Sequence, residues 1–180
     1  METRAKRNVK EYRAQGALKW IFAGVLGLAA VLFVLFVWFS PVYVADESMT
    51  PTLEKGDTVF YDRLYGHFRS YERGDMVAFR DPVTGSILIK RIVALGGETV
   101  EAKDGVLIID GRYGMDEQRY DATAPLDFAR TKVPEGQVFV LSDDRNYGED
   151  SRNGAIGCLE KKDILGLVRV RIRDFTIFTR

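Results

Sequence analysis

The sequence predicts an all-β domain, mainly antiparallel, that follows a single N-terminal transmembrane helix. Three observations lead to this fold class: an uncharged run of twenty residues near the N-terminus, a series of short β-rich segments after it, and no sustained helical period in the remainder. With 180 residues, the chain is long enough for one domain and an anchor. We therefore divide it into a basic tail (1–19), a membrane helix (20–40) and a β domain (41–180).

The apolar run from Trp20 to Phe39 has the length and composition of a membrane-spanning helix. At roughly 1.5 Å per residue it would extend about 30 Å, which matches the hydrocarbon core of a bilayer. Trp20 and Trp38 lie near its two ends, where indole rings favour the membrane interface, and Pro41 stops the helix soon afterwards. The alternative is a cleaved secretory signal, but the run is longer than an ordinary signal core, and Tyr43 stands where a cleavage site needs a small residue.

Charge predicts the orientation of this helix. Residues 1–19 carry six basic and two acidic side chains, whereas the rest of the chain carries 20 basic and 24 acidic ones. Because positive charge is retained on the cytoplasmic side, we expect the tail in the cytoplasm and residues 41–180 on the far side of the membrane.

After Pro41 the pattern changes to short runs rich in β-branched and aromatic residues, separated by turn residues. Alternation is clearest in Leu167–Arg173, where one face is apolar and the other is basic. Asp104-Gly105 lies between two runs and predicts a tight hairpin, since both residues tolerate a positive φ. The polar stretch 111–134 shows no sustained period, so we expect a looser excursion there. The expected strands are Val42–Ala45, Thr58–Asp62, Asp75–Arg80, Ser86–Leu95, Thr99–Lys103, Val106–Ile109, Gln137–Leu141 and Leu165–Arg173.

Composition argues against several classes of function. The formal net charge is zero, which gives no indication of nucleic-acid binding. His67 and Cys158 are the only histidine and cysteine, so a histidine and cysteine cluster for zinc and an internal disulfide are both excluded. Cys158 is expected to be a small buried apolar residue.

Four segments carry the residues best suited to chemistry. Ser48 precedes Met-x-Pro, and an isolated serine of this kind is more often a turn residue than a nucleophile. Lys90 interrupts a nearly continuous apolar strand, so it is either a charge that protects a sheet edge or a lysine partly desolvated by its neighbours. Taken singly, no segment is decisive. The four are Glu47–Leu53, Gly56–Val59, Lys90–Glu98 and Ser142–Arg152.

Together and in this order, the segments resemble bacterial type I signal peptidases. The Ser-Met-Thr-Pro-Thr-Leu box, the Lys-Arg-Ile box and the final Asp-Ser-Arg all match, and a transmembrane helix precedes them. The similarity covers about Val42 to Val100 and Gln137 to Val170, which leaves about 101–134 as a variable hairpin and loop insertion. The archaeal and endoplasmic-reticulum branch has histidine at the position of Lys90, so the bacterial branch is implied.

This resemblance implies that Ser48 is the nucleophile of a serine endopeptidase and that Lys90 is its general base. A serine hydroxyl needs a base to remove its proton, and lysine can serve only when neutral. Lowering its pKa from about 10.4 to roughly 7–8 requires about 3–5 kcal/mol, which apolar neighbours and nearby lipid would supply by desolvation. The backbone N–H of Ser48 would stabilise the oxyanion that precedes an acyl-enzyme.

The resemblance also implies how substrate is held. The signal peptide of an exported preprotein would add as an extended strand between 42–47 and 87–89, and the enzyme would cut after small residues of the A-x-A type. The implied pocket residues are Val44, Met49, Leu53 and Ile89. It also implies that an Arg91–Asp143 pair, an Asp150–Arg152 pair and Ser151 support the catalytic residues. The alternative is that the two pairs are ordinary surface ion pairs that contribute little stability. No cofactor or metal is implied, and the other expected partner is membrane lipid.

The chain departs from the family's pattern at a few positions. Asp46 replaces the usual Gly or Ser two residues before the nucleophile, and because its charge would oppose an oxyanion we expect it to point away. Gly148 replaces a serine that normally holds the catalytic lysine, which leaves a water molecule or Ser151 to orient Lys90. Ser142 and Asp144 replace the usual Gly and Asn. These changes affect the expected rate more than the type of reaction.

Three other functions fit parts of the pattern. The same chemistry would serve a dedicated substrate, such as a surface-fibre subunit. A non-catalytic anchored β domain that binds a partner would be indifferent to Ser48 and Lys90. A self-cleaving repressor-type protease shares the dyad and the β fold, but the membrane helix and the lack of a DNA-binding half argue against it.

Overall fold

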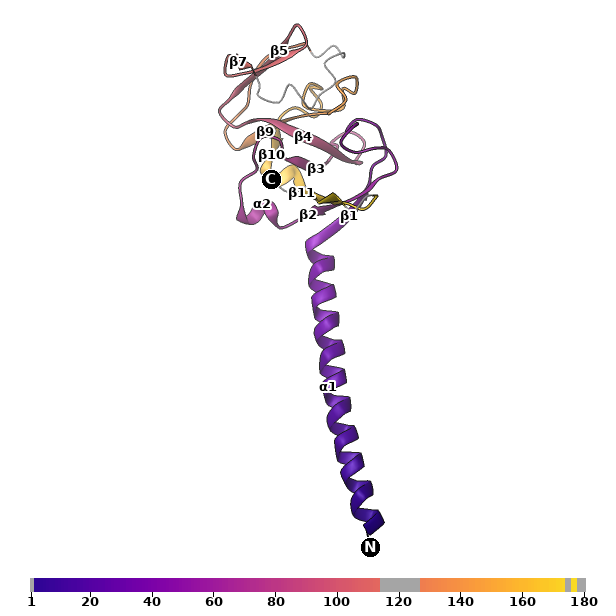
Figure 1. The fold of residues 1–180 in the computed structure, drawn as a ribbon. Helices are drawn as coiled ribbons and strands as arrows, with labels where there is room; N and C mark the ends of the chain where they lie inside the picture. Colours follow the sequence, from indigo (N-terminus) through magenta and orange to yellow (C-terminus); the bar gives the residue numbers. More distant parts are fainter. Residues whose placement is uncertain (1, 114–126, 174–175, 178–180) are drawn as a thin grey trace. The chain divides into compact units, whose positions relative to one another are not determined.

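The structure is a computed structural model that describes residues 2–113, 127–173 and 176–177. The chain forms two compact units, Met1–Trp38 and Phe39–Arg180. The first is a single helix, α1 (Glu2–Trp38), so the basic tail continues the helix of the apolar run (Figure 1). Residues Leu18–Trp38 have a mean hydropathy of 2.7, and this segment is long and apolar enough to cross a membrane.

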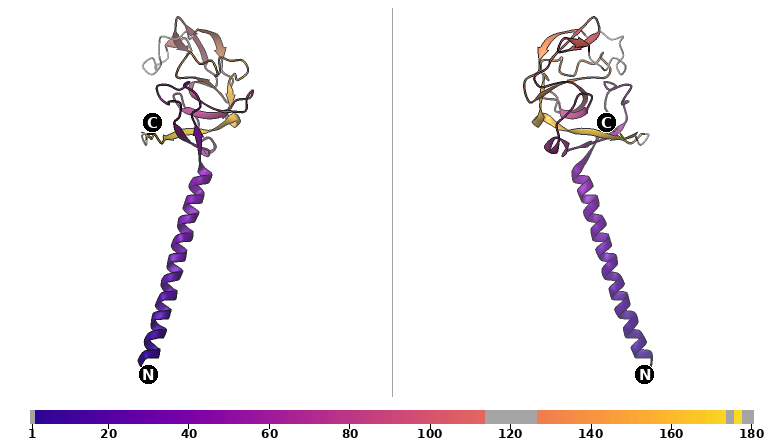
Figure 2. Two further views of the ribbon diagram at one scale, coloured as in Figure 1. Left: turned by 90° about the vertical axis from the view of Figure 1, so that its right-hand side faces the viewer. Right: turned by 60° about the vertical axis from the view of Figure 1, so that its left-hand side comes forward.

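The second unit is built around an eight-stranded sheet in which all neighbours pair antiparallel. The strand order is β1-β2-β11-β3-β4-β9-β10, and β12 pairs with β11. Figure 2 gives two further views of this sheet and of α1. The strands are β1 (Phe39–Tyr43), β2 (Thr58–Asp62), β3 (Met76–Arg80), β4 (Ile87–Leu95), β9 (Gln137–Leu141), β10 (Leu159–Glu160), β11 (Ile164–Arg171) and β12 (Thr176–Ile177). The prediction of a mainly antiparallel β fold with one N-terminal apolar helix is confirmed.

A smaller sheet has the strand order β7-β6-β5-β8. Asp104 and Gly105, with φ angles of 52° and 77°, form the predicted hairpin turn, in which Lys103 pairs with Val106. The sheet consists of β5 (Thr99–Lys103), β6 (Val106–Ile109), β7 (Arg112–Tyr113) and β8 (Phe128–Lys132). Two short helical turns, α2 (Tyr65–Phe68) and the 3-10 turn η1 (Lys161–Asp163), complete the described elements.

The expectation of a looser excursion over 111–134 was partly wrong. β7 and β8 both lie within it, and β8 pairs with β5. β8 reads Phe-Ala-Arg-Thr-Lys and buries no residue fully, so it lacks the apolar alternation that marks a strand in a sequence. Residues 114–126 lie outside the described part of the chain.

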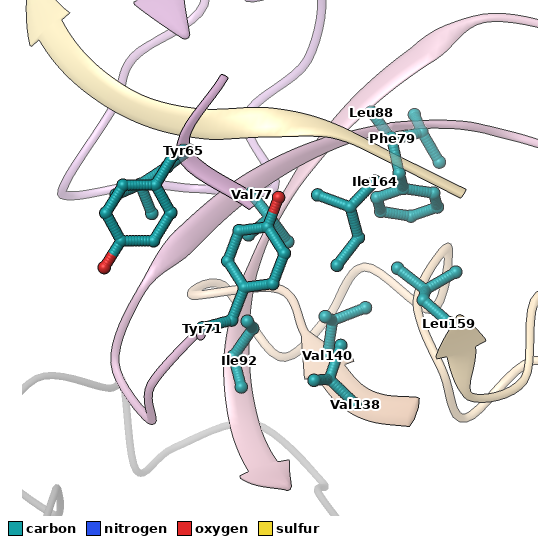
Figure 3. Packing of buried hydrophobic residues seen from close by; sticks show 11 residues of the cluster. Tyr65, Tyr71, Val77, Phe79, Leu88, Ile92, Val138, Val140, Leu159 and Ile164 are labelled. Atoms are coloured by element: carbon teal, nitrogen blue, oxygen red, sulfur yellow. The ribbon is translucent and has the colours of Figure 1, made fainter. Parts of the chain in front are cut away.

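Three apolar clusters form the interior. The first gathers side chains of α2, β3, β4, β9, β10 and β11, among them Tyr65 and Phe79, together with Tyr71 from the loop after α2 (Figure 3). The second brings all four predicted pocket residues, Val44, Met49, Leu53 and Ile89, into one group with neighbours from β2, β3 and β11. The third lies beneath the smaller sheet, where Phe128 stacks on Phe139 with ring centres 5.4 Å apart. Cys158 packs against this third cluster and is half-buried rather than fully buried.

The two sides of β4 differ along its length. On one side β3 pairs with β4 from Ile87 to Arg91. On the other side the β9 ladder begins only at Arg91 and continues to Leu95. In the described ladders, residues 87–90 therefore have a neighbouring strand on one side only.

Candidate active site

The side chains of Ser48 and Lys90 meet in the interior of the β domain. The Lys90 Nζ atom lies 2.6 Å from the Ser48 Oγ atom, although 42 residues separate them in the chain. Lys90 is wholly buried in the middle of β4, and Ser48 is 2% exposed in the turn that follows β1. This is hydrogen-bond distance, and it permits direct proton transfer between the two groups.

The surroundings of Lys90 lower the pKa of its amine. Burial is the largest cause, because a desolvated ammonium loses its hydration. Four carboxylates act in the opposite direction and favour the charged form: Asp46, Asp150, Glu149 and Asp143. Burial prevails, so the neutral amine forms at a lower pH than in an exposed lysine.

Local hydrogen bonds fix the turn that carries Ser48. The Leu53 N–H donates to the Met49 carbonyl at 2.8 Å, which closes a helical turn directly after the serine. The Ser48 carbonyl accepts the Asp144 N–H at 2.9 Å, which ties the turn to the segment after β9. The backbone of Ser48 is thus held from both sides.

Asp46 does not point away from the site, so that expectation was wrong. Its Oδ1 atom accepts the backbone N–H of Ser48 at 2.8 Å. An Asp or Asn side chain commonly caps an N–H two residues further on, and here this local preference prevails. The carboxylate therefore contacts the group expected to donate to the oxyanion.

A cleft of about 230 Å³ opens beside Ser48. One wall is formed by residues 43–46 and the other by residues 86–89, and Glu149 also lines it. Of the predicted pocket residues, Val44, Met49 and Ile89 line the cleft. Leu53 is wholly buried among them and is not part of the lining.

Arg91 and Asp143 form a buried, two-pronged ion pair. The Arg91 Nε atom donates to Asp143 Oδ1 at 2.8 Å and its Nη2 atom to Oδ2 at 2.5 Å. Arg91 is 4% exposed and Asp143 is wholly buried. Thr52 completes the pair, since its hydroxyl lies 2.7 Å from Asp143 Oδ2 and accepts from Arg91. Nothing in the sequence distinguishes Thr52, beyond its place in the serine box, as a partner of this pair.

Asp150 and Arg152 organise the loop after β9. The guanidinium of Arg152 donates twice to Asp150, at 2.9 and 2.8 Å, and also to the carbonyls of Arg145 and Tyr147. Asp150 in turn accepts the Ser142 N–H at 3.0 Å. This network fixes the path of 142–152 past the dyad.

The two serines of this loop lie in different settings. Ser151 accepts the Val140 N–H at 2.9 Å through its hydroxyl, so it is joined to the backbone of β9. The Ser142 hydroxyl is buried and has no hydrogen-bond partner among the described residues. Ser142 directly follows Leu141, which pairs with Arg91, and an antiparallel ladder continued by one residue would place it opposite Lys90.

The described residues contain no group of three or more His, Cys, Asp or Glu side chains arranged to hold a metal ion.

A family model and relatives of known sequence indicate the same family. The family model described as signal peptidase, peptidase S26, matches residues 17–173. Signal peptidase I of Bacillus licheniformis is 33% identical over 157 residues, which cover 82% of this chain and 84% of that protein. Signal peptidase I P of Bacillus subtilis subsp. natto is 32% identical over 175 residues, covering 92% and 90%. A crystal structure of a signal peptidase I from Enterococcus faecalis superposes with a TM-score of 0.43 at 29% identity, covering 55% of this chain and 97% of that one.

Proposed function

This chain belongs to the signal peptidase family, peptidase S26, and is a hydrolase of the bacterial signal peptidase I type, and we propose that it acts through a Ser–Lys mechanism. In this mechanism the Ser48 hydroxyl attacks the substrate and Lys90 is the general base. The observation that carries the proposal is the 2.6 Å contact between the Ser48 hydroxyl and a wholly buried lysine. Two features of this pair support the proposal: the short distance between the groups and the lowered pKa of the amine.

The proposed reaction has two halves. Neutral Lys90 takes the proton of Ser48 Oγ, which bonds to the carbonyl carbon of the residue before the cut. The oxyanion accepts from the Ser48 N–H, and collapse breaks the C–N bond while Lys90 returns the proton to the leaving amine. Water then hydrolyses the acyl-enzyme, again with Lys90 as base, which frees the signal peptide and regenerates Ser48.

The cleft supports an extended substrate. Residues 87–89 of β4 lack a described strand on the side away from β3, so their backbone is available for pairing with a signal peptide. Val44, Met49 and Ile89 would contact its side chains, with Leu53 closing the pocket from beneath. A cleft of about 230 Å³ with these walls suits small residues of the A-x-A type.

We propose that α1 anchors the enzyme in the cytoplasmic membrane with the β domain outside. The apolar segment Leu18–Trp38 and the six basic residues that precede Trp20 support this orientation. Protease added to intact spheroplasts should digest the β domain. Protection until the membrane is broken would mean the opposite orientation.

One assay tests the reaction itself. The full-length chain in detergent is incubated with a preprotein, and the new N-terminus of the product is sequenced. We expect cleavage after an A-x-A sequence and a mature protein as product. Cleavage elsewhere would contradict the substrate assignment, and an intact preprotein would contradict the activity.

The replacement of Gly148 by Ser should change kcat by less than threefold, about 0.65 kcal/mol. A Cβ atom at Gly148 would meet nothing within 4 Å, and this glycine does not have a positive φ, so the substitution is tolerated. A serine hydroxyl bonded to Lys90 at the ordinary tetrahedral angle would place the amine about 3.7 Å from the Cβ atom, and Lys90 does not come within 4 Å of that position. A gain of tenfold or more would show that residue 148 reaches the base.

Ser142 is our candidate for orienting Lys90 in place of residue 148. Its hydroxyl is buried and belongs to the register position opposite Lys90, and it has no partner among the described residues, so we propose that it turns to bond the Lys90 amine during the reaction. Ser142→Ala should therefore lower kcat several-fold with KM and Tm unchanged, because one hydrogen bond is worth about 0.5–1.5 kcal/mol. Equal kcat in Ser142→Ala and wild type would exclude it.

A further inference from the structure

We propose that Asp46 is a displaceable plug of the oxyanion site, which makes the enzyme selective for substrates that fill the cleft. This inference rests on the proposed roles of Ser48 and Lys90. Its starting point is the 2.8 Å contact between Asp46 Oδ1 and the Ser48 N–H. The family's usual Gly or Ser at this position could not place a carboxylate there.

The Ser48 N–H cannot donate to Asp46 and to the oxyanion at the same time. A backbone N–H has one hydrogen, and a well-aligned bond serves one acceptor at a time. The oxyanion must lie about 2.7–3.1 Å from the same nitrogen, which is the space that Asp46 Oδ1 fills. Two negative oxygens would also repel each other at that distance. Asp46 must therefore leave the Ser48 N–H before the tetrahedral intermediate can be stabilised.

Asp46 is negatively charged at neutral pH. Burial alone would raise its pKa, but hydrogen bonds from the Ser48 side chain and backbone, together with Lys90 and Lys55, make the pKa lower than usual. Protonation therefore does not remove the plug under ordinary conditions. Displacement requires the side chain to move, and Asp46 is only half-buried at the wall of the cleft, so solvent is available to receive it.

The same carboxylate also acts on the base. Among the four carboxylates that raise the pKa of Lys90, Asp46 has the largest effect. The others are Asp150, Glu149 and Asp143, and Tyr147 also faces Asp46. In the resting enzyme Asp46 thus favours the ammonium form of Lys90 and occupies the Ser48 N–H, and both effects oppose catalysis.

Displacement requires free energy that a substrate must provide through contacts elsewhere. A preprotein that pairs with residues 87–89 and fills the pocket can use that binding energy to drive Asp46 out. A short peptide with few contacts in the cleft cannot. The plug thereby suppresses cleavage of chance Ala-containing segments that do not bind along the whole cleft.

The test compares Asp46→Ala with wild type on two substrates, a preprotein and a short peptide that covers only the residues around its cut. We expect kcat/KM for the short peptide to rise about tenfold or more, because an unblocked oxyanion donor is worth a large factor in rate. The preprotein should gain less than about threefold, since its binding energy already displaces the plug. Asp46→Ser, which removes the carboxylate but keeps a short polar side chain, is measured alongside in case the alanine variant folds poorly.

The pH profile gives a second readout. Because the base must be neutral, kcat/KM of the wild type should rise with pH through the pKa of Lys90. Loss of Asp46 removes an anion that raises this pKa, so the rise should move to lower pH. Glu149→Gln is the matched control: Glu149 lines the cleft and also raises the pKa of Lys90, but accepts no described hydrogen bond from Ser48.

Glu149→Gln should shift the profile while the ratio of short-peptide to preprotein activity stays at the wild-type value. If Glu149→Gln changes that ratio as much as Asp46→Ala does, charge alone explains the effect and the plug is refuted. Unchanged or reduced short-peptide cleavage by both Asp46 variants would refute it as well. If the wild type cleaves no preprotein at all, the proposed function itself has failed, which is a distinct result.

Discussion

Ser48→Ala and Lys90→Ala are each expected to lower kcat for preprotein cleavage by at least about 10⁴-fold. The two side chains form one unit, in which the hydroxyl is unreactive without its base and the base has nothing to activate without the hydroxyl. The double variant should therefore be little worse than either single one. Lys90→Arg should fail equally, because a guanidinium stays protonated and cannot take the serine proton. The measurement is single-turnover cleavage in detergent.

The controls separate loss of chemistry from loss of fold. Lys132→Ala removes an exposed lysine from β8 in the smaller sheet and should leave kcat unchanged. Lys90→Met keeps most of the buried stem without its charge and should melt no lower than wild type, since an apolar replacement of a buried charge is often neutral or stabilising. Substantial cleavage by Lys90→Arg would remove lysine as the base.

Asp143→Ala is expected to destabilise the β domain by about 3–5 kcal/mol. The substitution leaves the Arg91 guanidinium buried without its carboxylate, and breaking one partner of a buried pair carries a penalty of that size. For a domain of this length the Tm should fall by roughly 10–15 °C. Calorimetry or a circular-dichroism melt in detergent measures the change.

An exposed ion pair provides the comparison. Lys162 and Glu160 lie 2.6 Å apart, with side chains 73% and 46% exposed, so Lys162→Ala should leave the Tm unchanged. A fall in the Tm of Lys162→Ala as large as that of Asp143→Ala would show that burial does not account for a difference in stability between the two ion pairs. A Tm of Asp143→Ala within 2 °C of wild type would contradict the structural role assigned to Arg91 and Asp143.

Four strands were predicted with their exact bounds. β2, β5, β6 and β9 begin and end at the predicted residues, because each is a short run rich in β-branched or aromatic side chains that turn residues bound on either side. The start of β1 at Phe39 was not predictable, since the apolar residues at the end of α1 continue into the strand without a break. β8 was not predicted, because its side chains are mostly polar and because it pairs with β5, a segment far from it in the sequence.

At the site, the catalytic candidates were predictable from their residue types, whereas the contacts of their side chains were not. An apolar strand around Lys90 indicated desolvation, and the lysine is indeed wholly buried. The direction of the Asp46 side chain depends on one rotamer and one backbone N–H, which no sequence pattern specifies. The burial of Arg91 and Asp143 depends on Thr52 and Gly74 closing around them, and this too appears only in three dimensions.

The one-sided pairing of residues 87–90 in β4 also bears on how molecules of this protein meet one another. A row of backbone donors and acceptors without a neighbouring strand can pair with any extended chain, including the exposed strand of a second molecule. Soluble β proteins usually protect such edges against aggregation. Here the shield is geometric: the wall of residues 43–46 stands across the cleft from residues 86–89. We expect a single extended segment to enter between these walls more readily than a strand that is already part of another folded sheet. The same geometry that suits a preprotein would then disfavour edge-to-edge pairing of two copies of the enzyme.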